Sequence, residues 1–174
     1  MTFYLSYVPI RGFTQPVYFQ FDAGLNPYAH ILLRKGHLVT DQPYDVTVSL
    51  HLPRTPVNTA AGNFMIDLQL LAPTSTSGRP KDEPVILARE RRPAILTYYS
   101  PLIEYLHKLI SLPLYVLGWR KEEERIELLV MEGVEFSRGG RQTPISARLE
   151  LSNAPHMQIY NAAISFKTKL RGLR

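Results

Sequence analysis

The sequence predicts a mainly β protein, an antiparallel β-sandwich of about eight strands with one amphipathic, largely hydrophobic helical insertion. Two observations predict the sandwich: short runs with strand patterning recur along the chain, and turn-forming residues separate them. A third predicts the insertion, because residues 100–119 alone keep a helical period. We find no internal repeat and no shift in composition, so we expect residues 1–174 to form one domain.

The composition is that of a soluble globular protein, with 45% hydrophobic and 20% charged residues. The 14 prolines argue against long helices. The chain has no cysteine, which excludes disulfides and thiolate metal sites. A net charge of +5 favours anionic partners such as phospholipid head groups or nucleic acid.

Residues 44–52 form the clearest predicted strand, because apolar and polar residues alternate strictly along it. Residues 64–71 repeat this pattern after residues 53–63, which we interpret as a long loop. Gly62 is expected to adopt a positive φ before the second strand. Further strands are expected at residues 17–21, 29–33, 85–89, 94–99, 126–136 (with a bulge at Gly133), 146–151 and 157–170.

The predicted helix has Ser100 as N-cap and Pro101 at its first position, and Pro113 is expected to kink or end it. Twelve helical residues rise only about 18 Å, too little to cross a bilayer. Its polar face comprises Glu104, His107, Lys108 and Ser111, and its apolar face comprises Leu102, Ile103, Leu106, Leu109 and Ile110.

Two interpretations of this helix remain open. An amphipathic stripe usually packs on its own fold, so the pattern alone favours a helix packed on a sheet. The apolar character continues beyond Pro113, however, with aromatic residues of the kind that favour membrane interfaces, and this favours contact with lipid. These later residues are Leu114, Tyr115, Val116, Leu117 and Trp119.

Basic residues cluster at two places in the sequence, and these clusters have two interpretations. They are either a solvated sheet face or a surface that attracts anionic lipid. Nucleic acid is not expected, because no basic run is interleaved with aromatic residues. One cluster is Arg89, Arg91 and Arg92, and the other is Lys167, Lys169 and Arg171.

The sequence offers no motif for catalysis. It contains no nucleophile elbow, no phosphate-binding glycine loop and no zinc-protease motif, and its five histidines are scattered through different elements. We therefore expect no catalytic residues, no cofactor and no metal.

Several short stretches, in consistent order over almost the whole chain, closely resemble the lumenal domain of the seipin family. The most specific are QPYDV (residues 42–46), LPRTPVN (52–58) and GNFM (62–65). FYLSYVP (3–9), PVYF (16–19), LGW (117–119) and LRGLR (170–174) extend the resemblance.

The resemblance implies a ring-forming lumenal β-sandwich that carries hydrophobic helices and has a transmembrane helix on each side, here lacking. It implies a non-enzymatic role in lipid droplet formation, at contacts between the endoplasmic reticulum membrane and the droplet. Phospholipid and neutral lipid are the implied partners. The runner-up is a lipid-binding or transfer module that holds one lipid between the sheets, in a cavity lined by residues such as Val46, Val48, Phe64 and Ile66.

Two departures from animal seipins refine these implications. The lack of cysteines and of a glycosylation sequon suggests a fungal-type member. Where animal members have paired serines in the hydrophobic helix, this chain has Leu112 and Pro113, which argues against capture of triacylglycerol by this helix alone. Fungal members work with a partner membrane protein, and the resemblance implies one here.

Overall fold

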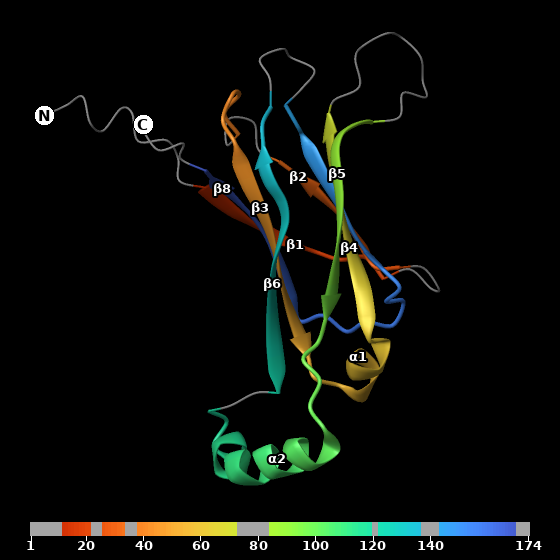
Figure 1. The fold of residues 1–174 in the computed structure, drawn as a ribbon, viewed down its shortest axis with the longest axis vertical. Helices are drawn as coiled ribbons and strands as arrows, with labels where there is room; N and C mark the ends of the chain where they lie inside the picture. Colours follow the sequence, from red (N-terminus) through yellow and green to blue (C-terminus); the bar gives the residue numbers. More distant parts are fainter. Residues whose placement is uncertain are drawn as a thin grey trace, which may run out of the picture.

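The chain folds as the predicted antiparallel β-sandwich (Figure 1). This computed structural model describes residues 12–21, 26–33, 38–72, 84–119, 122–136 and 143–169. In these ranges eight strands form two four-stranded sheets. One has the order β1 (Gly12–Val17), β8 (Asn161–Thr168), β3 (Tyr44–Pro53), β6 (Glu123–Val134). The other has the order β2 (Tyr28–Leu32), β7 (Ser146–Ser152), β4 (Asn63–Ala72), β5 (Val85–Ile95).

The core lies between the sheets and follows from the alternation of β3 and β4. In β3 the apolar residues are buried while the polar residues between them are partly exposed, as the period of two requires. β4 and the neighbouring strands supply the facing side chains. The fully buried core residues include Val46, Val48, Leu50, Phe64, Ile66, Leu68, Leu149, Ile164 and Phe166.

The bulge predicted at Gly133 is confirmed. Gly133 has φ 62°, and its N–H donates to a carboxylate oxygen of Asp45 at 2.8 Å. The register between β3 and β6 shifts at this point, on either side of Val46.

Three strand boundaries differ from the predictions. β5 is one strand, not two, because Pro93 is tolerated on an edge strand, where one side needs no hydrogen-bond donor. β1 ends where the predicted strand 17–21 begins. Its first residue, Gly12, lies so close to β8 that a Cβ there would be 2.3 Å from the Phe166 carbonyl oxygen. β8 begins only at Asn161, because the backbone of Gln158 is hydrogen-bonded by the side chain of Asn58.

The expected loop at residues 53–63 contains a short helix, α1 (Pro56–Ala61), which the sequence analysis missed. Thr55 caps it, because its hydroxyl accepts from the N–H of Asn58 at 3.3 Å. Pro56 lies at its first position, and Gly62 ends it with φ 64°, the positive value that was predicted. A cap, a proline at the first position and a glycine at the end were the signals available in the sequence.

The predicted helical insertion is α2 (Pro101–Val116). It lies beyond the end of the sandwich where β3 and β5 finish and β6 begins (Figure 1). The helix does not end at Pro113 but continues to Val116, and Ser100 occupies the N-cap position without a side-chain capping bond. Sixteen residues rise about 24 Å. Within the described ranges no helix is both long and apolar enough to cross a bilayer.

Candidate functional site

The polar face of α2 faces the sandwich. Glu104, Lys108, Ser111 and Tyr115, spaced at 4, 3 and 4 residues, are the least exposed side chains of the helix and form one stripe. Ser111 is 3% exposed. The Lys108 ammonium lies 3.0 Å from a Glu104 carboxylate oxygen and 3.5 Å from one of Glu122, which follows the helix.

The apolar face of α2 is exposed on the surface. Leu102 is 79% exposed, Leu109 69% and Ile110 70%. The expectation from pattern alone, that this stripe packs on a sheet, is therefore wrong. The physical reason is that the polar stripe finds ion-pair partners at the end of the sandwich. The exposed apolar residues of α2 and its C-terminal end are Leu102, Ile103, Tyr105, Leu106, Leu109, Ile110, Leu112, Leu114, Val116, Leu117 and Trp119.

Of the predicted site residues in this region, only Tyr115 does not belong to the exposed apolar face, because it is partly buried on the side that faces the sandwich. Tyr105 and Leu112 were not among the predicted site residues, although both are exposed and apolar. Tyr105 is not at a position of the apolar stripe, and the signal that could have found it is its aromatic side chain. Monomeric proteins rarely expose contiguous apolar surface of this kind, which usually marks an interaction site.

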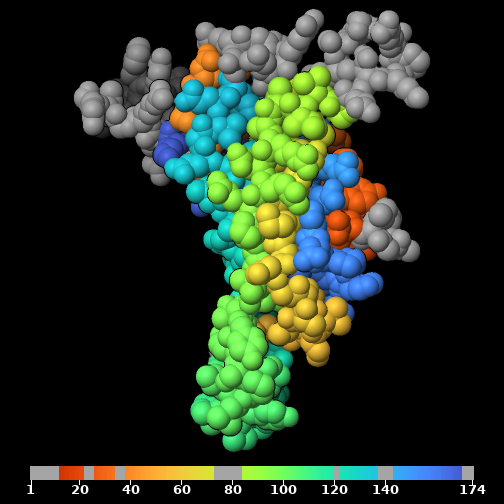
Figure 2. Space-filling view, turned by 45° about the vertical axis from the view of Figure 1, so that its right-hand side comes forward, coloured from red at the N-terminus to blue at the C-terminus, as the bar shows by residue number. Residues whose placement is uncertain are grey.

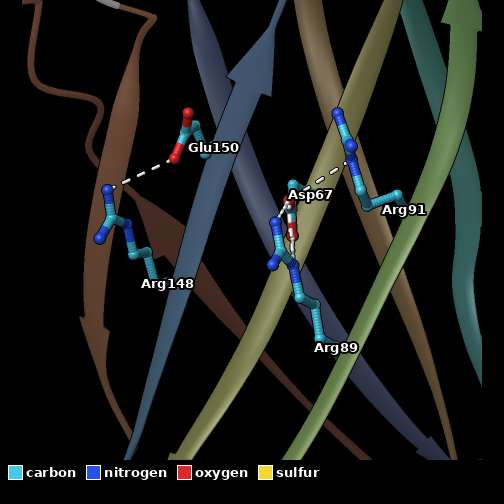
Figure 3. Close-up of polar contacts among 5 residues, drawn as sticks. All are labelled: Asp67, Arg89, Arg91, Arg148 and Glu150. Atoms are coloured by element: carbon cyan, nitrogen blue, oxygen red, sulfur yellow. Dashed lines mark hydrogen bonds and ion pairs between the residues drawn. The ribbon is translucent and has the colours of Figure 1, made fainter. Parts of the chain in front are cut away.

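Arg89 and Arg91 lie on the outer face of the second sheet, where they share the carboxylate of Asp67 (Figure 3). Arg89 Nη2 is 2.5 Å from Asp67 Oδ2 and its Nε is 3.1 Å from Oδ1, while Arg91 Nε is 3.5 Å from Oδ2. The hydrogen bond to Asp67 raises the pKa of Arg89. Arg148 and Glu150 form a second pair on this face, 3.4 Å apart.

Arg92 does not join Arg89 and Arg91. Its register partner in β4 is Ile66, which faces the core, and its Nε donates to the Val130 carbonyl of β6 at 3.2 Å. The structure therefore divides this predicted cluster between the outer face and the seam where β5 meets β6.

The second basic cluster is also divided. Lys167 is exposed, whereas Lys169 Nζ lies 2.5 Å from Glu132 Oε1. This hydrogen bond lowers the pKa of Glu132 and raises the pKa of Lys169. Arg171 lies outside the described residues.

The pattern of the family described as "Putative adipose-regulatory protein (Seipin)" matches residues 1–174. The chain belongs to the seipin family. The seipin homolog of Schizosaccharomyces pombe is 27% identical over 184 aligned positions, which cover 99% of this chain and 70% of that protein. Seipin membership supports a role in lipid droplet biogenesis and a place in the endoplasmic reticulum.

The residues proposed to line a lipid cavity in this seipin-family chain lie in the packed core. Val46, Val48, Phe64 and Ile66 are all buried in one hydrophobic cluster. The pockets that we describe lie instead near α1 and between α2 and the sandwich. Among the described residues no group of three or more histidine, aspartate or glutamate side chains is placed to hold a metal ion.

Proposed function

We propose that this seipin-family chain is a non-enzymatic scaffold of lipid droplet biogenesis at the endoplasmic reticulum. Its sandwich lies in the lumen, in a homo-oligomeric ring, and directs α2 toward the membrane at contacts with the droplet. The observation that carries this proposal is the orientation of α2, whose polar stripe faces its own fold while its apolar residues face outward. Such a helix needs another apolar phase to cover it.

The strength of the contact supports a ring. Full burial of Leu102, Ile103, Leu106, Leu109 and Ile110 is worth about 10 kcal/mol gross, before the costs of ordering and desolvation. After these costs, a single helix is expected to bind a membrane only weakly. Several copies in one ring bind together at high effective concentration, so oligomerisation is part of the proposed mechanism.

The proposed partners are phospholipid, neutral lipid and a membrane protein. Leu112 and Pro113 give α2 no paired hydroxyl groups in its second half. A partner membrane protein would then supply polar contacts to neutral lipid that this helix lacks. The exposed Trp119 and Tyr105 suit the boundary between head groups and acyl chains.

The packed core favours a scaffold over a carrier that holds one lipid between the sheets. A carrier predicts stoichiometric lipid in the purified chain, which mass spectrometry would detect; the scaffold predicts none bound between the sheets.

Flotation with phosphatidylcholine vesicles tests the proposal. Replacing two α2 leucines (Leu106→Ser with Leu109→Ser) should reduce vesicle binding at least about tenfold, because two apolar side chains are lost from the contact. The matched control replaces two exposed leucines of the sandwich, Leu32→Ser with Leu129→Ser, and should leave binding unchanged. Equal binding by both double variants contradicts the proposal. A chain that stays monomeric when a transmembrane helix is joined to each of its ends contradicts the ring.

A further inference from the structure

The junction between α2 and the sandwich converges on Arg54, a member of the LPRTPVN stretch. Its side chain is only 16% exposed. Nη1 donates to Glu124 Oε2 at 2.7 Å, and the guanidinium carbon lies 4.4 Å from the centre of the Tyr99 ring. The backbone N–H of Arg54 also donates to the Glu122 carbonyl at 3.1 Å.

Two of these partners belong to the segments that connect α2 to the sandwich, and the third belongs to the sandwich itself. Tyr99 precedes the helix and Glu122 follows it, whereas Glu124 lies at the start of β6. Glu124 also fastens the first segment, because its Oε1 accepts from the Thr97 N–H at 3.0 Å and from the Thr97 hydroxyl at 2.7 Å. Arg54 and Glu124 together therefore hold the entry and the exit of α2.

The contact reaches α2 itself through an aromatic stack and an ion pair. The Tyr99 ring stacks on His107, with centres 6.4 Å apart and planes 10° apart, and Lys108 pairs with Glu122. Apart from Ser111, the described side chains of α2 are not buried, and the helix stands clear of the strands in Figures 1 and 2. Its orientation therefore depends on a few side-chain contacts and not on an apolar interface.

We infer that Arg54 is a positioning residue that fixes the angle of α2 relative to the sandwich, and so the direction in which the apolar face points. Arginine suits this position because its planar group donates to a carboxylate and stacks on an aromatic ring at the same time, which lysine does not reproduce. The other polar residues of the stretch serve α1: Thr55 caps it, and Asn58 links it to Pro53 and Gln158. Only the consequence at a membrane rests on the proposed function.

The test measures the orientation of α2 in solution. The chain has no cysteine, so spin labels can be attached to cysteines introduced at Leu109 and at either Ser49 or Leu32, one on each sheet. Double electron–electron resonance then gives two distance distributions for the full chain. Arg54→Lys should shift or broaden both distributions while the unfolding midpoint of the sandwich changes little.

The matched control is Arg125→Lys, because Arg125 lies at the same end of β6 but makes an exposed ion pair with Glu127. It should leave both distributions unchanged. Tyr99 lies outside the core, and Tyr99→Leu removes the aromatic ring that lies between Arg54 and His107. This variant should reproduce the effect of Arg54→Lys. Unchanged distributions in Arg54→Lys and Tyr99→Leu overturn the inference. No membrane is present in this experiment, so its failure is distinct from failure of vesicle binding by the unsubstituted chain.

Discussion

The guanidinium of Arg89 donates hydrogen bonds to both carboxylate oxygens of Asp67. Asp67 is buried although it lies on the outer face of a sheet. The two side chains come from neighbouring strands, and Arg89 covers Asp67 while remaining half exposed itself. This relationship changes the interpretation of the basic residues in β5 as a surface for anionic lipid, because Arg89 and Arg91 are already paired with a carboxylate of the same fold.

Arg89→Ala should therefore destabilise the sandwich. It leaves the buried Asp67 with only the longer contact to Arg91. We expect a loss in the free energy of unfolding that is larger than for an exposed pair, because Asp67 is buried, and smaller than for a fully buried pair, because Arg89 itself is half exposed. Urea denaturation measures it, with Arg125→Ala as a surface control that should change stability by less than about 0.5 kcal/mol. Equal losses in the two variants contradict the structural role.

Lys167 and Lys169 should differ in their contribution to anionic lipid binding. A basic residue near an anionic membrane is worth about 1 kcal/mol, or roughly a fivefold change in affinity. Lys167→Gln should therefore weaken binding to vesicles that contain phosphatidylserine, whereas Lys169→Gln should have less effect because Lys169 is paired with Glu132. The difference should shrink as salt rises. Binding that responds neither to salt nor to Lys167→Gln would identify these faces as merely solvated.

The polar stripe of α2 should lose an ion pair in acid. The hydrogen bond from Lys108 lowers the pKa of Glu104 below its ordinary value of 4.5, and Glu104 raises the pKa of Lys108 above 10.5. The pair therefore stabilises the folded chain at pH values between these two pKa values. This stabilisation is lost as the pH falls through the lowered pKa of Glu104 or rises through the raised pKa of Lys108.

Fluorescence anisotropy of Trp119, the only tryptophan, reports on this end of the helix. It should stay constant from pH 5 to 9, values that lie between the two pKa values, and fall in stronger acid. Glu104→Gln should lower the anisotropy already at neutral pH and reduce the acid step. Glu127→Gln, in an exposed pair on β6, should not. An identical titration in Glu104→Gln and the unsubstituted chain contradicts this role of the pair.

The strand alternation predicted the sandwich because β3 and β4 bury an apolar residue at every second position, a property that a strand carries in its own sequence. The family resemblance was also visible in short stretches such as LPRTPVN, and the comparisons confirm the family. The helical period likewise predicted both faces of α2.

The direction of those faces was not predictable, because it depends on contacts between residues far apart in the sequence. Arg54 and Glu124 are 70 positions apart, and Lys169 and Glu132 are 37 apart. Periodicity identifies which residues share a face, but it does not show which face finds partners. The same reason explains why three of the predicted basic residues are paired with carboxylates in the structure.

The exposure of spin-labelled α2 positions on vesicles tests the membrane contact most directly. Labels at Leu102, Leu106 and Leu109 are compared with labels at Ser49 and Leu32 on the sandwich, using a water-soluble relaxation agent and oxygen. When the chain binds phosphatidylcholine vesicles, we expect the α2 labels to lose contact with the water-soluble agent and gain contact with oxygen, while the sandwich labels stay unchanged. Labels on α2 that remain as accessible to the water-soluble agent in the bound chain as in the free chain would contradict the proposed function.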